Sequence, residues 1–385
     1  MSKKSKIAII HPSLTCSGAG CVAVWTIEAL KAEYALTLFV TKFPDIEKLN
    51  KFFGSNLKQD DFSIRLIPSF SLFGKPLFES FLLTVNLAQR YYKKHSKEFD
   101  LVISTYSEMD FGEIGIQYIY IPTWDDTIVR ETGQLPMTWF HRNSLIRKLY
   151  KQVNICISGF SEERMKQNMT LVTSNWTGVM VRRVYGINSH TIYPPVQDRF
   201  PEVPWEDREE GFVCVGTLSP VKKIERVIEI IKMARIENPK LHLHIIGNAP
   251  DLKYKAKIQH ICAQNSDWIF LEGGLYREEL SWLVSNHKFG IHGMLQEHFG
   301  ITVAEMVKAG CIPFVPNGGG QIEIVNDSRL TYDSIENAVE KISAVLRNKI
   351  LQKSLLESLS HSKHKFSKDC FIKSMREIVR NTLDK

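Results

Sequence analysis

The stretch Glu297-His-Phe-Gly-Ile-Thr-Val-Ala-Glu305 is the most informative part of this 385-residue chain. A Phe-Gly turn follows the first glutamate, and an apolar helical run carries the second. The glycine allows the backbone to approach a ligand closely, and the helix that begins after it offers unpaired N–H groups and a positive dipole end. Carboxylates accept strong hydrogen bonds from hydroxyl groups. The stretch therefore predicts a site for an anion that carries hydroxyls, and a nucleotide-sugar fits that description.

The residues after Glu305 extend the pattern, because Met306 to Gly320 read as a helix end, a short buried strand and a tight glycine loop. Together with the two glutamates, this segment resembles the signature of family 4 retaining glycosyltransferases of the GT-B fold. The resemblance implies that Glu297 lies by the donor sugar as a catalytic residue and that Glu305 binds the ribose of the nucleotide. It also implies that the backbone between them contacts sugar hydroxyls and phosphate. The donor-binding residues implied there are His298, Phe299, Gly300, Ile301 and Thr302. A structural role for His298 stays open.

A second segment, from Val215 to Lys223, comes directly after an apolar strand. The family usually has an arginine and a lysine here that hold the donor diphosphate. Lys222 matches the lysine, so the resemblance makes it a catalytic residue that stabilises the leaving group. Thr217 stands in the place of the arginine, and a threonine donates one hydrogen bond but brings no charge. The missing cation is then expected from Lys223 or from an arginine elsewhere, or catalysis is weaker.

Two further loops resemble donor-contacting parts of the family. The segment around Leu275 is similar to the loop whose backbone meets the nucleobase, and Gly18 and Gly20 loosely match a glycine loop against the donor phosphates. A dinucleotide-binding interpretation of the latter fails, because Ala23 stands at the third glycine position. A simple tight turn stays open. Tyr120 is a second departure, because many relatives have a histidine there, and tyrosine does not titrate near neutral pH.

Short apolar strands alternate with helical segments along most of the chain, which predicts an α/β fold with parallel sheets. Paired prolines at Pro194-Pro195 interrupt the pattern and predict a hinge. The expected architecture is GT-B, with two Rossmann-like domains facing an interdomain cleft. The expected bounds are 1–193 for an acceptor-binding domain, 194–365 for a nucleotide-sugar-binding domain, and 366–385 for a helix that crosses back to the first domain.

The expected strands and helices follow from apolar runs and caps. Expected helices include 22–31, 227–235 and one from about Ser161, capped by Ser158. Expected strands or short apolar runs are 7–10, 36–40, 101–104, 116–121, 154–157, 170–175, 212–215, 241–246, 268–271 and 289–292.

Composition is that of a globular protein, with 44% hydrophobic and 24% charged residues. Seven scattered cysteines without paired spacing fit a reducing cytoplasm. No run approaches the roughly 18 apolar residues of a membrane span. Residues 1–190 hold 23 basic and 17 acidic residues, so most of the net charge of +7 lies there. That excess suits an anionic lipid surface or a phosphorylated acceptor, and a solvated surface explains it equally well. No nucleic-acid partner is expected.

No metal site is expected. His242 and His244 share one face of a strand and hint at metal binding, but the sequence offers no third ligand, so sheet packing is favoured. Asp125 and Asp126 are interpreted as exposed loop residues. The GT-B resemblance implies no metal cofactor, and the nucleotide-sugar is a substrate.

The resemblance thus implies a hexosyltransferase that moves a sugar from a nucleotide donor, with retention, to a lipid-linked or polysaccharide acceptor. His298 and the run 311–316 look most like relatives that use GDP-mannose, so this donor is favoured and a UDP-sugar comes next. One alternative is a catalytically degenerate nucleotide-sugar-binding protein, motivated by Thr217 and Tyr120. A nicotinamide-dependent oxidoreductase, motivated by the sheets and by Gly18 and Gly20, ranks far behind.

The expected location is cytoplasmic, with peripheral contact at the inner face of an anionic membrane. A basic and aromatic helix over 73–94 is the candidate membrane-facing element, and ordinary core packing explains that helix equally well.

Overall fold

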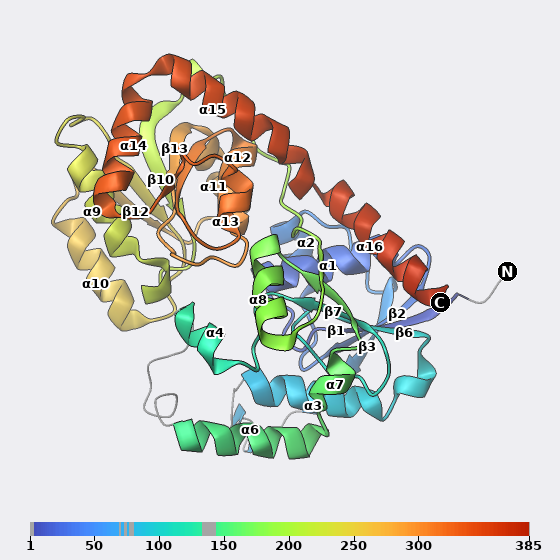
Figure 1. Cartoon of the computed structure of the whole chain (residues 1–385). Helices are drawn as coiled ribbons and strands as arrows, with labels where there is room; N and C mark the ends of the chain where they lie inside the picture. Colours follow the sequence, from blue (N-terminus) through green and yellow to red (C-terminus); the bar gives the residue numbers. More distant parts are fainter. Residues whose placement is uncertain (1–3, 69–70, 73–74, 77–80, 133–143, 385) are drawn as a thin grey trace. The chain divides into compact units, whose positions relative to one another are not determined.

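A computed structural model describes residues 4–68, 71–72, 75–76, 81–132 and 144–384. The chain forms two compact units (Figure 1). Unit 1 comprises Met1–Pro195 and Lys368–Lys385, and unit 2 comprises Val196–Ser367. The boundaries fall after the paired prolines and before the last helix, slightly later than the sequence analysis placed them. The first part of the expected 73–94 helix lies largely outside the described residues.

Unit 1 is built on a parallel sheet with strand order β3-β2-β1-β6-β7-β8-β9. The hydrophobic residues of its central strands are buried, because helices cover both faces of a parallel sheet. The strands are β1 (Lys6–Ile10), β2 (Ala35–Val40), β3 (Phe62–Leu66), β6 (Leu101–Ser104), β7 (Ile116–Ile119), β8 (Met169–Val172) and β9 (His190–Thr191), with a separate hairpin of β4 (Ser71–Leu72) and β5 (Lys75–Pro76).

The helices of unit 1 follow its strands in α/β alternation. They are α1 (Gly18–Leu30), α2 (Ile46–Phe53), α3 (Phe81–Lys93), α4 (Asp126–Glu131), α6 (Ser144–Ser158), α7 (Glu162–Met165), α8 (Asn175–Tyr185) and α16 (Lys368–Leu383). Helix α1 begins earlier than expected because the Ser17 hydroxyl accepts a hydrogen bond from the Gly20 N–H and caps it.

The interpretation of 154–157 as a strand-like run, with Ser158 capping the next helix, is wrong. These residues form the end of helix α6, whose apolar side chains recur at a helical spacing. Leu145, Leu149 and Val153 are four residues apart and exposed. The cap of the following helix is Ser161, whose hydroxyl accepts from the Arg164 N–H.

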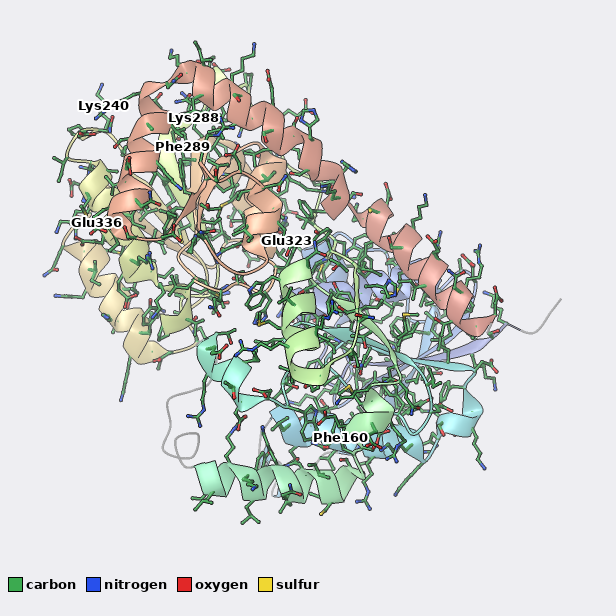
Figure 2. The ribbon with its side chains drawn as sticks, in the orientation of Figure 1. Phe160, Lys240, Lys288, Phe289, Glu323 and Glu336 are labelled. Atoms are coloured by element: carbon green, nitrogen blue, oxygen red, sulfur yellow. The ribbon has the colours of Figure 1, made fainter. Side chains whose placement is uncertain are left out.

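Unit 2 repeats the architecture with a parallel sheet of order β12-β11-β10-β13-β14-β15. Phe289 lies in its core (Figure 2). Its ring stacks on that of Phe212 at a centroid distance of 5.2 Å. The strands are β10 (Glu209–Val215), β11 (Leu243–Ile246), β12 (Ile269–Gly273), β13 (His287–Ile291), β14 (Ile312–Pro316) and β15 (Thr331–Tyr332). The helices are α9 (Ile224–Ala234), α10 (Leu252–Ala263), α11 (Arg277–Ser285), α12 (Ile301–Ala309), α13 (Gln321–Val325), α14 (Ile335–Arg347) and α15 (Lys349–Ser362).

Helix α16 packs on α1 and completes the core of unit 1, although it is the last element of the chain (Figure 1). Its buried stripe consists of Phe371, Met375 and Val379, which recur every four residues and join the cluster around Ile9 and Trp25. Hydrophobic burial therefore attaches the end of the chain to its beginning.

We predict that Met375→Ala destabilises unit 1 by about 2–5 kcal/mol, because it leaves a cavity in a close-packed core. Urea unfolding followed by circular dichroism measures the change. The control is Lys373→Ala, which truncates an exposed side chain of the same helix and is expected to change the free energy of unfolding by less than about 0.5 kcal/mol. Equal effects of the two substitutions would contradict the packing of α16.

Candidate functional site

Lys222, His292 and Glu297 form a compact charged group in unit 2. Lys222 ends a 3-10 turn (Pro220–Lys222) after β10, His292 follows β13, and Glu297 lies in the loop before α12. The Lys222 ammonium forms an ion pair with Glu297 Oε2, and His292 Nε2 lies 3.1 Å from the same oxygen. All three residues come after the carboxyl ends of parallel strands, which is where open α/β sheets bind ligands.

The glycine loop predicted from the sequence holds the backbone of Glu297. The Gly320 N–H donates to the Glu297 carbonyl at 2.7 Å, and Glu297 forms an isolated parallel bridge with Gly319. Gly319 has a φ of +75°, and a Cβ atom there would lie 2.2 Å from the Glu297 carbonyl oxygen. No other residue type fits this contact without a shift of the backbone.

The buried side chain of Gln321 connects the two loops beside Glu297. Its Nε2 donates to the carbonyls of Met294 and Gly318 at 2.9 Å each, and to the carbonyl of Pro316 at 3.2 Å. The carbonyl of Pro316 also accepts from the Gly318 N–H at 2.8 Å, so Gln321 adds to the bonds within this turn. The loop that carries Glu297 is therefore fixed independently of any ligand.

The charge state of Glu297 is set by opposing effects. Burial raises the pKa of this carboxyl, but the Lys222 charge and the hydrogen bond from His292 outweigh it and hold the pKa well below its usual range. Burial lowers the pKa of His292, and burial lowers the pKa of His298 to about 4. At neutral pH the group is therefore an ionised carboxylate between a lysine and neutral histidines.

Glu305 pairs with an arginine that the sequence analysis did not single out. Arg277, the first residue of α11, donates from Nη1 to Glu305 Oε1 at 2.7 Å, and both side chains are largely buried. Within the described chain, Arg277 Nε and Nη2 are buried without a hydrogen-bond partner. A buried guanidinium with unused donors is suited to bind an anion or hydroxyl groups. The position of Arg277, at the start of a helix shortly after the end of a strand, is the feature of the sequence that could have identified it as a candidate.

The remaining residues predicted for donor binding in this half also lie in unit 2. Gly300 is the N-cap residue of α12 with a φ of +103°, and Ile301 and Thr302 form the first turn. The Phe299 ring is buried against Phe366, with centroids 5.5 Å apart. The ring therefore packs in the core, and the donor contact predicted for Phe299 is left to its backbone. Thr217 is exposed and Leu275 is partly buried.

Gly18 and Gly20 belong to unit 1, at the start of α1. The Tyr120 hydroxyl donates to the Ala19 carbonyl at 3.2 Å and to the Thr105 carbonyl at 3.0 Å. His11, which the sequence analysis passed over, is fully buried nearby, with Nδ1 3.0 Å from Thr105 Oγ1. Its Nε2 is buried without a partner among the described residues, and burial lowers its pKa to about 4. His11 is therefore a neutral imidazole with one unused nitrogen.

Residues 196–360 match the family model described as glycosyl transferases group 1. The match covers most of unit 2, so this unit carries a glycosyltransferase group 1 domain. Its segments include Lys222, Glu297 and Glu305.

Two relatives extend the similarity to both units. The chain is 22% identical to a Dictyostelium discoideum protein named GDP-Man:Man(3)GlcNAc(2)-PP-Dol alpha-1,2-mannosyltransferase, over 98% of this chain and 85% of that protein. The human protein of the same name is 23% identical over 88% of this chain and 79% of its own length. At these identities the relatives' donor and acceptor remain properties of those proteins.

Solved structures share the fold at low identity. HepE of Anabaena, in complex with UDP and glucose, has a TM-score of 0.69 at 12% identity, covering 99% of this chain and 100% of HepE. Sucrose-phosphate synthase from Thermosynechococcus elongatus has a TM-score of 0.71 at 14% identity, covering 99% of this chain and 100% of the synthase. The predicted GT-B type of fold, with two Rossmann-like α/β domains, is confirmed.

Among the residues that the structure describes, none of the helices is both long enough and apolar enough to cross a membrane.

Breaking this ion pair, whose lysine and glutamate side chains are 23% and 15% exposed, is expected to be costly. We predict that Lys222→Met lowers the free energy of unfolding by about 3 kcal/mol, because it leaves the largely buried Glu297 carboxylate without its cation. Adding Glu297→Gln to that variant should recover part of the loss. Urea unfolding at neutral pH measures both. Lys257→Met, which breaks an exposed pair with Glu225, is the control and should change the free energy by less than about 1 kcal/mol.

Two neutral histidines, the buried His11 and the partly buried His298, predict a pH dependence of stability. His11 and His298 have pKa values of about 4, against about 6.5 when unfolded. Between these values the unfolded chain binds more protons, so stability decreases as the pH falls from about 6.5 to about 4. His298→Gln should reduce the drop in unfolding midpoint between pH 7 and pH 5, whereas exposed His260→Gln should not. An unchanged drop in the His298 variant would contradict the assignment.

Proposed function

We propose that the chain is a retaining glycosyltransferase that transfers a hexose, most favourably mannose, from a nucleotide-sugar donor to a lipid-linked or polysaccharide acceptor. The observation that carries the proposal is the ionised Glu297, held between Lys222 and His292 by the loop that leads into helix α12. A fixed carboxylate beside a cation is suited to read sugar hydroxyls while the cation holds phosphate. The glycosyl transferases group 1 match over the same residues supports this assignment.

In the proposed mechanism, Lys222 and the start of α12 stabilise the negative charge that grows on the departing diphosphate. Both are positioned before the reaction, so little reorganisation is needed. Glu297 orients the sugar and Glu305 holds the ribose. Lys222 and His292 both contact Oε2 of Glu297, and we assign the other carboxylate oxygen to the sugar hydroxyls. The acceptor attacks with retention and without a metal cofactor in this proposal.

Arg277 is our candidate for the cation that Thr217 does not provide. It pairs with Glu305, and its two buried donors without partners are available to a nucleotide bound at that glutamate. Lys223, the other candidate, is exposed. A guanidinium binds phosphate or paired hydroxyls in a planar geometry, so it is a suitable replacement for the family's arginine.

The donor is proposed as GDP-mannose because the Dictyostelium and human relatives are named for GDP-Man and align with most of the chain. A UDP-sugar is the rival donor, since HepE of similar fold was solved with UDP and glucose. The same relatives, named for a dolichol-linked oligosaccharide, favour a lipid-linked acceptor over a polysaccharide.

We also propose peripheral contact with an anionic membrane from the cytoplasmic side. The supporting feature in the structure is helix α6, whose exposed Leu145, Leu149 and Val153 form an apolar stripe in the basic half of the sequence. The helix expected from the sequence for this role, α3, instead buries Leu82, Val85 and Tyr92 in the core of unit 1.

The test is sugar transfer and donor hydrolysis across GDP-, UDP- and ADP-sugars, with a lipid extract as acceptor source. We expect turnover of one donor, GDP-mannose first, and a decrease in kcat of about 100-fold or more in Glu297→Gln, because a preorganised polar contact is lost. The control is Glu278→Gln, an exposed glutamate of α11, which should leave turnover unchanged.

Donor binding without turnover under any acceptor condition would favour the alternative of a degenerate nucleotide-sugar-binding protein, which Thr217 and Tyr120 motivate. An equal loss of activity in both glutamate variants would contradict a specific role of Glu297. The anomeric configuration of the product, determined by NMR, tests retention separately.

A further inference from the structure

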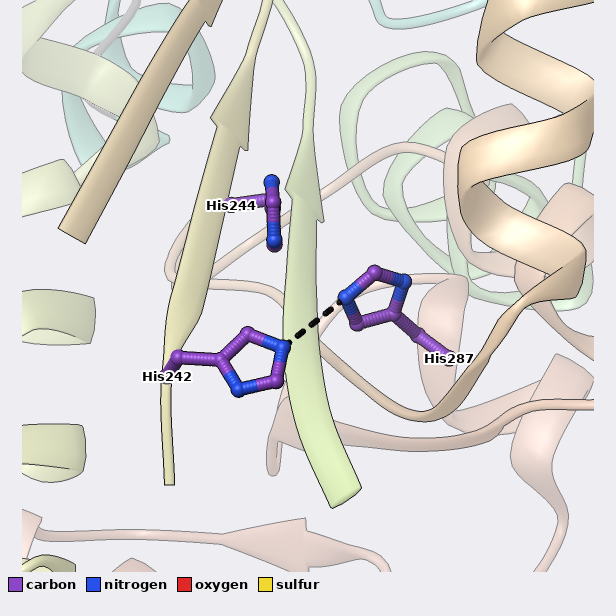
Figure 3. Close-up of side chains that lie close together, drawn as sticks. All are labelled: His242, His244 and His287. Atoms are coloured by element: carbon purple, nitrogen blue, oxygen red, sulfur yellow. Dashed lines mark hydrogen bonds between the residues drawn. The ribbon is translucent and has the colours of Figure 1, made fainter. Parts of the chain in front are cut away.

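Three histidines of unit 2 meet in space although they are far apart in sequence. His242 precedes β11, His244 lies within it, and His287 begins β13, 45 residues after His242. One ring nitrogen from each lies within 4.8 Å of the other two, and Nε2 of His242 is 3.1 Å from Nε2 of His287 (Figure 3). The sequence alone offers no third ligand beside His242 and His244 and so favours a packing role for them, whereas in the structure His287 supplies one.

The sheet topology produces this cluster. Strands β11 and β13 both pair with β10, so the side chains of His242 and His287 approach each other across that strand. The residue of β10 beneath them is Gly211, where a Cβ atom would lie 2.1 Å from His242 Nε2. Any larger residue at this position would displace the His242 ring, so Gly211 makes room for the cluster.

Two of the three imidazoles have a second partner that fixes their orientation. His244 Nδ1 lies 2.7 Å from Glu272 Oε1, and His287 Nδ1 lies 2.7 Å from the Leu283 carbonyl. With the proton on Nδ1, both His244 and His287 keep a lone pair on Nε2. Histidines that bind metals typically donate their other ring N–H to a carboxylate or a carbonyl in this way.

Among the described residues, the three rings have few hydrogen bonds to exchange with one another. His242 and His287 offer one such contact, and His244 is stacked on Phe270 at 4.8 Å.

We propose that His242, His244 and His287 bind a divalent transition-metal ion, with Zn²⁺ as the best-suited ion. Nitrogens that bind zinc tetrahedrally at about 2.0–2.1 Å are about 3.4 Å apart. The nitrogens of His242 and His287, at 3.1 Å, already lie near this spacing, and the His244 nitrogen, within 4.8 Å of both, would move closer. The fourth position belongs to water or to Glu209, whose Oε2 lies 3.3 Å from His242 Nε2.

The site lies at the amino-terminal ends of the strands, whereas Lys222, Glu297 and Glu305 follow the carboxyl ends. The ion would therefore hold β11 and β13 to β10 and stabilise unit 2, and it would have no contact with the proposed donor. This inference goes beyond the proposed function and stands or fails independently of it.

The test uses the full chain without a polyhistidine tag, stripped with chelator and titrated with Zn²⁺ in competition with a chromophoric chelator. We expect one Zn²⁺ per chain and a rise in the unfolding temperature of unit 2 on loading. His287→Ala should weaken binding by at least about 100-fold, and Glu272→Gln by about 10–100-fold, because it removes only the partner of His244. His260→Ala, an exposed histidine of α10, should change neither quantity.

Glu272→Gln keeps all three histidines in the sheet. A weaker affinity for Zn²⁺ in this variant therefore reports on metal binding and not on the packing of the histidines. Circular dichroism of the metal-free variants checks that they fold. Zinc binding of equal affinity in wild type and His287→Ala, or the absence of a saturable site in the folded wild type, would overturn the proposal and leave the cluster as sheet packing.

Discussion

The largely buried carboxylate of Glu297 is the constraint on which the arrangement of unit 2 depends. An ionised carboxylate removed from water is costly unless it is paired and hydrogen-bonded. Lys222 and His292 provide these partners, and they come from the ends of two adjacent strands, β10 and β13. The same loop is fixed from the other side by Gly319, Gly320 and Gln321. The charge is thus held in place before any ligand arrives, which is what electrostatic catalysis requires.

The two edges of the unit 2 sheet carry different chemistry. The carboxyl ends of the strands present charged groups, Lys222 with Glu297 and Arg277 with Glu305. The amino ends bring together His242, His244 and His287. Parallel strands make this separation possible, because every strand contributes one end to each edge. We assign the donor to the carboxyl ends of the strands, where the ion pairs lie. We assign the histidine cluster at the amino ends a role in stabilising unit 2.

Much of the fold was predictable from the sequence, because buried strands of a parallel sheet appear as apolar runs. The run 101–104 is a strand with those bounds in the structure. The run 154–157 was misassigned, since its three consecutive apolar residues fit a helix and a strand equally well and the decisive spacing lay upstream at Leu145 and Leu149. Glu297 and Glu305 were singled out because they flank a glycine and a helix start.

Arg277, the partner of Glu305, and His287, the third member of the histidine cluster, were not predictable in the same way. Both residues contact side chains that are distant in sequence: Arg277 contacts Glu305, and His287 contacts His242. The register of the strands and the crossover connections between them decide which side chains meet. His292 is a polar residue directly after a buried strand, which is weak evidence of a functional side chain. His11 stands in the same position after the first strand of unit 1. Such side chains are recognised only once the topology is known.

The most direct test of the account is a crystal structure of the full chain with GDP-mannose, or with GDP as the stable fragment. The account predicts the diphosphate at Lys222 and the start of α12, the ribose hydroxyls at Glu305, and the sugar hydroxyls at Glu297. A nucleotide bound elsewhere on the chain, or bound here with its ribose away from Glu305, would contradict it.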